Sequence, residues 1–215
     1  MDADGFTLYI ERSSAVQSVA LSRGGEIADA KTLDGADARS GDWVLRVRDF
    51  LAGRLVSRIV AGTGPGSFAG IRAALAFAQG YAIGSGCEVL GLPSPCALSQ
   101  VSGPLAVVGD SRRGCVWIAL FEGHSLATPV FQTEAPTAKS RVPSGVRVVS
   151  PDDARIGGML RETFGELYAG GALPSAEGLA RAALANPALL VREPRPLYLN
   201  PAVRPNAPLT RGGQI

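Results

Sequence analysis

The first thirty residues of the chain alternate short apolar runs with tight turns. Apolar, β-rich runs cover 7–10 and 18–21, and the pair Gly24-Gly25 separates the second run from a further short segment at 26–30. Apolar, β-rich runs bounded by turn residues predict strands, and adjacent glycines supply the backbone angles of a hairpin turn. We therefore expect the chain to open with a three-stranded antiparallel meander.

The period of the pattern lengthens after a loop at 32–41 that is rich in aspartate, alanine and glycine. From Asp42 onward, Trp43, Val47 and Phe50 fall on one helical face, and charged side chains occupy the other. This is the pattern of an amphipathic helix that rests on a core.

A strand, a glycine-rich turn, a second helix and another strand follow. The strands are predicted at 58–61 and 88–92, and the helix at 68–83. Two strands joined by a helix form a crossover, which pairs them in parallel.

Proline and glycine then interrupt the chain, and a second series of strands begins near residue 102. We expect a lobe of residues 1–102, a smaller lobe of 103–199 and an extended tail of 200–215. The second lobe opens with a hairpin like that of the first, a weak sign of an internal duplication. Strands of this lobe are predicted at 105–109, 115–121, 130–132 and 146–149, and helices at 159–167 and 175–184.

The composition argues against several classes of function. The chain has 215 residues and a formal net charge of +2, whereas a nucleic-acid clamp needs a clustered basic face. Three cysteines without CxxC spacing and a single histidine form no metal-binding set. The N-terminus is acidic, and no apolar run approaches the roughly 20 residues that span a bilayer. We expect a cytoplasmic protein without a metal or a membrane contact.

The most informative stretch is 61–72, which reads AGTGPGSFAGIR. Its glycines precede a helix whose first amides have no partner within the helix, so Gly64, Gly66, Ser67 and Phe68 could hold an anion or a nucleotide phosphate. Alternatively, the glycines let the strand end pass close to another backbone, and Ser67 caps the helix. The sequence leaves both interpretations open.

Two phosphate-binding motifs fit this stretch poorly. A P-loop needs a lysine, and the chain has none between Lys31 and Lys139. The loose dinucleotide pattern GxGxxG/A matches 64–69, but the strands before it form a predicted meander and no ribose-binding acid ends the next strand.

Several stretches together resemble the TsaB (YeaZ) family. Residues 59–72 resemble its GPGSFTGLR signature, with Ala69 in place of the usual threonine, and 107–117 resemble its DARRGEVY hairpin. Residues 18–26 and 196–199 agree in order and spacing, so the resemblance covers nearly the whole chain. It implies a two-lobed α/β fold with mixed sheets, the ribonuclease H-like fold of the actin, sugar kinase and Hsp70 ATPase superfamily.

The resemblance also implies a function without catalysis. TsaB proteins bind and activate the catalytic subunit TsaD, which makes N6-threonylcarbamoyladenosine at position 37 of tRNAs reading ANN codons. On this basis we expect TsaD and the ATPase TsaE as partners, a homodimer when TsaD is absent, and only indirect contact with tRNA. No cofactor is expected on this chain alone, and ATP or ADP would bind at the joint surface with TsaD. The alternative is an independent nucleotide-binding phosphotransferase or ATPase of the same superfold.

The first predicted strand departs from the family pattern. The family continues with Asp-Thr-Ser, whereas this chain has Glu11-Arg12-Ser13. The short aspartate that superfamily ATPases keep near the phosphates is replaced by a longer glutamate beside an arginine. This difference argues further against autonomous ATP hydrolysis.

The second helix is apolar nearly all round, and Arg72 and Gln79 are its only clearly polar residues between 71 and 83. Such a helix needs cover on more than one side, from its own lobe or from another chain. Proteins similar to this one use the two helices of this lobe for a four-helix contact with TsaD or with a second copy. The interface predicted on this resemblance consists of Trp43, Val47, Phe50, Arg72, Ala74, Leu75, Phe77, Ala78, Tyr81 and Ala82. Ala78→Arg is then expected to abolish TsaD binding without unfolding the chain.

The remaining candidates carry weaker signals. A lone histidine such as His124 is usually a surface residue, and Cys115 lies in a strand pattern typical of a core thiol. Asp110 and the arginines after it belong either to a solvated turn or to the edge of an interlobe cleft. The arginines of the tail indicate a solvated segment with at most weak attraction for tRNA.

Overall fold

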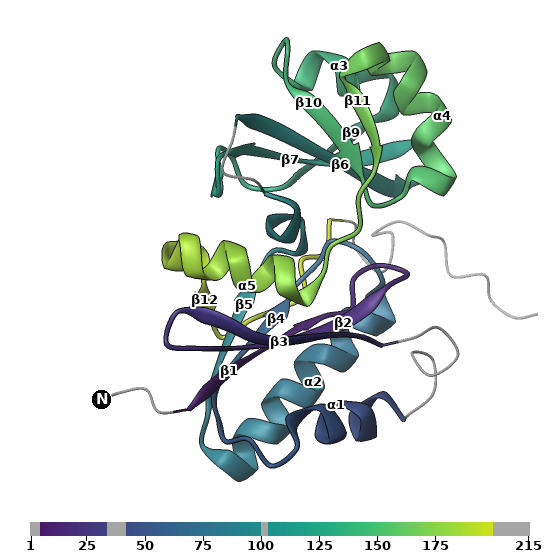
Figure 1. The fold of residues 1–215 in the computed structure, drawn as a ribbon. Coiled ribbons are helices and arrows are strands. Elements are labelled where there is room, and N and C mark those ends of the chain that lie inside the picture. The colour runs from purple at the N-terminus through teal and green to yellow at the C-terminus, as the bar shows by residue number, and fades with distance from the viewer. Residues whose placement is uncertain (1–4, 34–41, 100–102, 200–215) are drawn as a thin grey trace, which may run out of the picture.

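The computed structural model describes residues 5–33, 42–99 and 103–199. Two lobes lie one above the other, each built on a sheet, and a helix fills part of the space between them (Figure 1). The two-lobed α/β fold with mixed sheets that the sequence resemblance implied is confirmed. The predicted tail of 200–215 lies outside the described residues.

The first lobe is built on a six-stranded sheet in the order β12-β5-β4-β1-β2-β3. The first three strands form the predicted antiparallel meander, and β4 and β5 run parallel to β1, as the predicted crossover requires. The strands are β1 (Phe6–Glu11), β2 (Gln17–Arg23), β3 (Glu26–Leu33), β4 (Val56–Gly62), β5 (Glu88–Leu92) and β12 (Val191–Arg192).

Helices cover both faces of this sheet (Figure 1). Helices α1 (Trp43–Leu51) and α2 (Phe68–Ser85) lie on one face, where they pack on Leu8 and Ile10 of β1. Tyr9 points to the opposite face and packs in a core that includes α5 (Ala176–Ala185). Because neighbouring side chains of a strand point to opposite faces, a strand covered on both sides is apolar at every position. This explains the continuous apolar run at the start of the chain.

The second lobe repeats the topology of the first. Its sheet runs β9-β7-β6-β10-β11, with the first three strands antiparallel and the last two parallel to β6, and a short β8 also pairs with β7. Helices α3 and α4 follow β9 and β10, as α1 and α2 follow β3 and β4. The elements are β6 (Pro104–Arg112), β7 (Cys115–Glu122), β8 (Ser125–Leu126), β9 (Phe131–Glu134), α3 (Ala138–Arg141), β10 (Arg147–Ser150), α4 (Asp153–Phe164) and β11 (Tyr168–Gly171). The hairpin similarity in the sequence is therefore part of a repeated topology.

The end of the chain returns to the first lobe. The amide of Ala176, at the start of α5, donates to Ser18 Oγ of β2 at 2.8 Å, and β12 pairs with β5. This placement differs from the expected second lobe of 103–199, which assigned α5 and β12 to that lobe. The physical reason is that α1 and α2 cover one face of the first sheet only, so its other face needs a helix from elsewhere in the chain.

One apolar core joins the two lobes. It contains Tyr9, Val60 and Leu90 from the first sheet, side chains of the second sheet, and the inner face of α5. The second sheet and the helix contribute Leu105, Val107, Trp117, Ala119, Phe121, Ala176, Leu179, Ala180, Ala182 and Ala183. The lobes are therefore joined by packed side chains as well as by the chain that links them.

Leu179→Ala tests this shared core. Leu179 is fully buried, so its truncation is expected to lower the free energy of unfolding by about 2–5 kcal/mol. Both lobes are expected to unfold in one denaturant transition, followed by tryptophan fluorescence and circular dichroism. Leu184→Ala on the exposed side of the same helix is the control and should change stability by less than about 1 kcal/mol. Two separate transitions in the wild-type chain would contradict a shared core.

Candidate functional site

The glycine-rich turn after β4 packs tightly against the turn after β1. A Cβ atom on Gly62 would collide with the Glu11 carboxyl group, one on Gly66 with the carbonyl of Ser13, and one on Gly70 with the carbonyl of Arg12. Any other residue at these positions would push the two turns apart. We call residues 62–70 the glycine corner.

Several backbone amides of the glycine corner have partners within the protein, and the Thr63 amide donates to the carbonyl of Leu92 at 2.9 Å. Gly64 donates to Ser94 Oγ at 3.0 Å, Ser67 to the carbonyl of Ser13 at 2.7 Å, and Gly70 to Ser67 Oγ at 3.3 Å. Ser67 is thus the N-cap residue of α2. Of the two interpretations that the sequence left open, this geometry supports close backbone packing with a serine cap.

Glu11 is sealed beneath the glycine corner. Its side chain is fully buried, and Oε1 accepts a hydrogen bond from the Ser13 amide at 2.6 Å. Burial raises the pKa of this carboxyl group above its ordinary value of 4.5, and hydrogen bonds with Ser13 and Ser94 oppose the rise. Glu11 is therefore part of the core beneath the turn.

The neighbouring Arg12 ties the same turn to α1. Its guanidinium carbon lies 3.9 Å from the centre of the Trp43 ring, a cation–π distance, and burial lowers its pKa to about 10. Trp43 in turn contacts Phe77 of α2, with ring centres 5.2 Å apart. The turn after β1 thus fixes both helices that cover the outer face of the first sheet.

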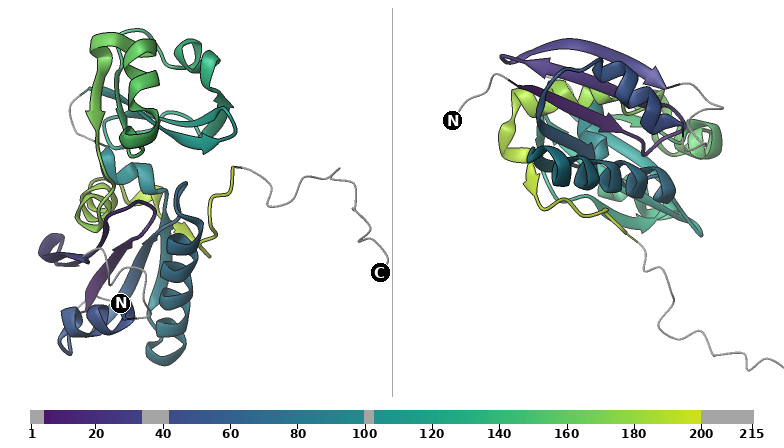
Figure 2. Two further views of the ribbon diagram at one scale, coloured as in Figure 1. Left: turned by 90° about the vertical axis from the view of Figure 1, so that its right-hand side faces the viewer. Right: turned by 90° about the horizontal axis from the view of Figure 1, so that it is seen from below.

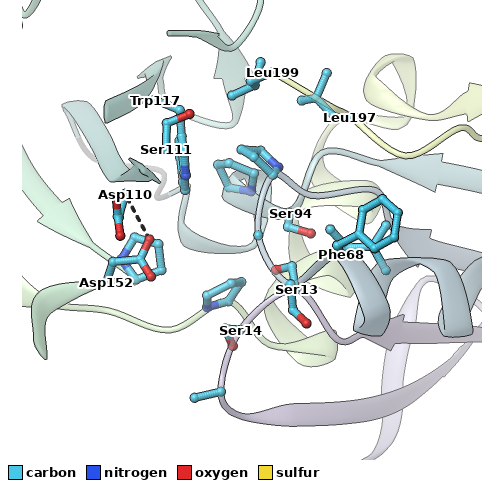
Figure 3. Close-up of a pocket in the computed structure, with 18 of the residues that line it drawn as sticks. Ser13, Ser14, Phe68, Ser94, Asp110, Ser111, Trp117, Asp152, Leu197 and Leu199 are labelled. Carbon is cyan, nitrogen blue, oxygen red and sulfur yellow. Dashed lines mark hydrogen bonds between the residues drawn. The ribbon is translucent and has the colours of Figure 1, made fainter. Parts of the chain in front are cut away.

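A cavity of about 720 Å³ opens between the lobes (Figure 3). Ser13, Ser67 and Phe68 form part of its wall on the first lobe, and Gly66 is also exposed there. Leu197, Tyr198 and Leu199 belong to an extended segment of residues 193–199, which we call the strap. The second lobe contributes Asp110, Ser111, Arg112, Trp117, Pro151, Asp152, Ala154 and Arg155.

The charged groups on the second-lobe wall neutralise one another. The Asp110 amide donates to the Asp152 carboxylate at 2.8 Å (Figure 3), and Arg155 pairs with both aspartates. Arg112 lies 3.4 Å from the Asp110 carboxylate. Asp110 and Arg112 therefore occupy the edge of the interlobe cleft, the second of the two placements considered for this turn.

The single histidine contacts one hydroxyl group. His124 Nδ1 lies 2.9 Å from Ser99 Oγ, and the Ser99 hydroxyl also lies 2.7 Å from the carbonyl of Cys96. Among the described residues, no group of three or more histidine, cysteine, aspartate or glutamate side chains could hold a metal ion.

Most residues of the predicted partner interface lie inside the first lobe of the isolated chain. The side chains of Trp43, Val47, Phe50, Ala74, Leu75 and Ala78 are buried inside the first lobe, and Phe77, Tyr81 and Ala82 are half-buried. Of the ten predicted residues, Arg72 alone is exposed. The alanines at 74 and 78 let α2 approach its own sheet, and the aromatic side chains form the seam with α1.

The opposite side of α2 is exposed and carries its own row of small residues. Its exposed residues at helical spacing are Ala69, Arg72, Ala76, Gly80 and Ile83, which we call the docking face. Ile83 is 89% exposed, and Phe68 beside the row is 51% exposed. Figure 2 shows α1 and α2 side by side on the outside of the first lobe.

Although α2 is apolar, no helix in the described part of the chain is long and apolar enough to cross a membrane.

A signal for this face was present in the sequence. Arg72 and Gln79 are the clearly polar residues of α2, and polar side chains mark the solvent side of a helix. Ala76 lies four residues after Arg72, and Ile83 lies four residues after Gln79, so each falls on the same side of the helix as the polar residue before it. The spacing of small residues pointed equally well to Ala74 and Ala78, which face the core.

Two solved structures of Pseudomonas aeruginosa proteins resemble this chain over most of its length. YeaZ superposes with a TM-score of 0.68 at 23% identity, over 91% of this chain and 100% of YeaZ. A protein described as similar to peptidase YeaZ superposes with a TM-score of 0.69 at 22% identity, with the same coverage. The chain has the YeaZ fold. No protein-family model and no curated protein matches it.

Ala78→Arg and Ala76→Arg separate the two sides of α2. Ala78 is fully buried in the YeaZ fold, so the arginine would have to displace the core, and we expect loss of about 3 kcal/mol or more of unfolding free energy. Ala76 is exposed, so its replacement should change stability by less than about 1 kcal/mol. Urea titrations of both variants test this, and equal stability would contradict the assigned orientation of α2.

Glu11→Gln tests the buried carboxyl group. Burial raises the pKa of the Glu11 carboxyl group in the folded state. The contribution of the protonated carboxyl group to stability is therefore fully present below about pH 4.5, and it is lost as the pH rises through the folded-state pKa. The uncharged variant escapes this loss, so its stability relative to wild type is expected to increase across that interval. Unfolding measured from pH 4 to pH 9 checks this, with Glu162→Gln on the surface of α4 as the control. A pH-independent difference would contradict it.

Proposed function

We propose that this chain is an accessory protein of the TsaB (YeaZ) family that binds and activates TsaD. TsaD would then carry out the transfer that produces N6-threonylcarbamoyladenosine at position 37 of tRNAs reading ANN codons. The YeaZ fold and the sequence GPGSFAGIR at 64–72 support this assignment. The role of this chain is to present a surface that TsaD recognises.

The docking face is the observation that carries the proposal. Alanine and glycine at three of its five positions let a second helix approach closely, and Ile83 and Phe68 offer apolar area beside them. Val44 and Leu45 of the neighbouring helix α1 are also exposed. A helical partner that covers both helices would bury this area in a four-helix contact.

The geometry of the interlobe cavity favours a non-catalytic role over a phosphotransferase. The amides of Gly64, Ser67 and Gly70 are used within the protein, and Glu11 is sealed beneath them. The aspartates on the opposite wall are paired with arginines. On this proposal, ATP or ADP binds at the joint surface with TsaD, and TsaE and tRNA reach this chain through the complex.

Ala76→Arg tests the docking face. The long, charged side chain would keep a partner helix away, so co-purification with TsaD and formation of the modified nucleoside are both expected to fall at least tenfold. Ala185→Arg, on the exposed end of α5, makes the same chemical change away from this face and should retain both activities. Normal TsaD binding by Ala76→Arg would contradict the assigned surface.

Calorimetric titration of the isolated chain with ATP addresses the competing function. The proposal predicts no turnover and no tight binding by this chain alone. Nucleotide hydrolysis by the purified protein, lost on replacement of Asp110 or Asp152 by asparagine, would instead support an independent phosphotransferase or ATPase.

A further inference from the structure

Arg72 is the one charged residue of α2 and lies in the docking face between small, uncharged neighbours. In the described part of the chain, no carboxylate lies within salt-bridge distance of its guanidinium. Instead, the guanidinium carbon lies 5.0 Å from the centre of the Phe68 ring. The charge therefore contacts an aromatic ring and has no partner of opposite sign among the residues that the structure describes.

The strap also contacts this aromatic ring. Tyr198 stacks on Phe68 with ring centres 5.2 Å apart and an angle of 28° between the planes. The strap is itself fixed to the first sheet, because the Leu197 amide donates to the carbonyl of Thr63 at 2.8 Å and Pro194 packs directly against Gly91. Phe68 thus contacts both Tyr198, which the strap fixes to the first lobe, and Arg72, and we call these three side chains the Tyr198–Phe68–Arg72 stack.

A partner that covers the docking face removes water from Arg72. An arginine that loses its water needs an anionic group, because an unpaired charge in an interface is strongly unfavourable. Its planar guanidinium suits a carboxylate that accepts two parallel hydrogen bonds. The surrounding alanine, glycine and isoleucine favour a protein helix as the source, since nucleic acid is bound by clusters of basic side chains.

A second copy of this chain supplies that anion poorly. Helix α2 contains no acidic residue, and the single acid of α1, Asp49, is bound by its neighbour Arg48 at 2.9 Å. A two-fold contact between docking faces would bury two guanidinium groups without carboxylates from α2. The charge pattern thus separates a different partner from a homodimer, although both would use the same helix.

We propose that the Tyr198–Phe68–Arg72 stack presents a fixed guanidinium that recognises a carboxylate on a helix of the partner protein. This inference rests on the proposed function and assigns the specificity of that interface. Arg72 makes the contact, and Phe68 and Tyr198 position it. The same stack makes the docking face selective for an acidic partner helix over a second copy of this chain.

Calorimetric titrations of TsaD with variants of this chain test the contact. Arg72→Gln is expected to weaken binding about tenfold or more and to reduce its dependence on salt, and Arg72→Lys should restore part of the affinity. Tyr198→Ala should weaken binding several-fold in the wild-type background and have little further effect in Arg72→Gln, because Tyr198 acts through the guanidinium. Tyr198→Phe keeps the stacked ring and is the matched control.

Two results would overturn the inference while the proposed function stands. One is wild-type affinity in Arg72→Gln, and the other is an equal effect of Tyr198→Ala with and without Arg72. A loss of tRNA binding in Arg72→Gln with unchanged TsaD binding would assign Arg72 to a phosphate and would also contradict it.

Sedimentation of the isolated chain provides a separate test. Removal of the unpaired charge in Arg72→Gln is expected to strengthen self-association, and unchanged or weaker self-association would contradict the inference. A wild-type chain that binds no TsaD contradicts the proposed function, and the sedimentation result then decides the inference independently.

Discussion

The close approach of two backbone turns determines the geometry of the first lobe. The glycine corner after β4 touches the turn after β1 at positions where a Cβ atom would collide with Glu11, Arg12 or Ser13. This contact sets where α2 begins, because the Ser67 amide bonds to the carbonyl of Ser13 and the Ser67 side chain caps the helix. The position of Phe68, and with it the wall of the cavity and the end of the docking face, follows from that start.

The same contact explains why a phosphate-like motif in the sequence has a packing role here. Glycines before a helix are needed both by loops that wrap an anion and by loops that touch another backbone. The sequence does not show which acceptors the freed amides will meet. In this fold the acceptors include Ser13 and Ser94, which come from the turn after β1 and from the segment after β5.

Local patterns predicted the elements of the fold well, and long-range packing accounts for what they missed. The meander at the start of the chain and the crossover that follows have clear periods and clear turns, and both are present. The orientation of α2 was missed because a helix that is apolar nearly all round has almost no contrast between its two sides. The return of α5 to the first sheet has no local signal at all, since it depends on an uncovered face more than 150 residues away, as the bond from Ala176 to Ser18 shows.

The return of α5 and the strap makes the first lobe a discontinuous domain. Its sheet is built from the beginning of the chain, but its second covering layer comes from residues near the end. During synthesis on a ribosome, the sheet face that carries Tyr9 and Val60 stays uncovered until α5 has been made, after the second lobe. The stack that includes Tyr198 forms later still, because Tyr198 follows both α5 and β12 along the chain, so this part of the docking face is completed only after the second lobe has been synthesised.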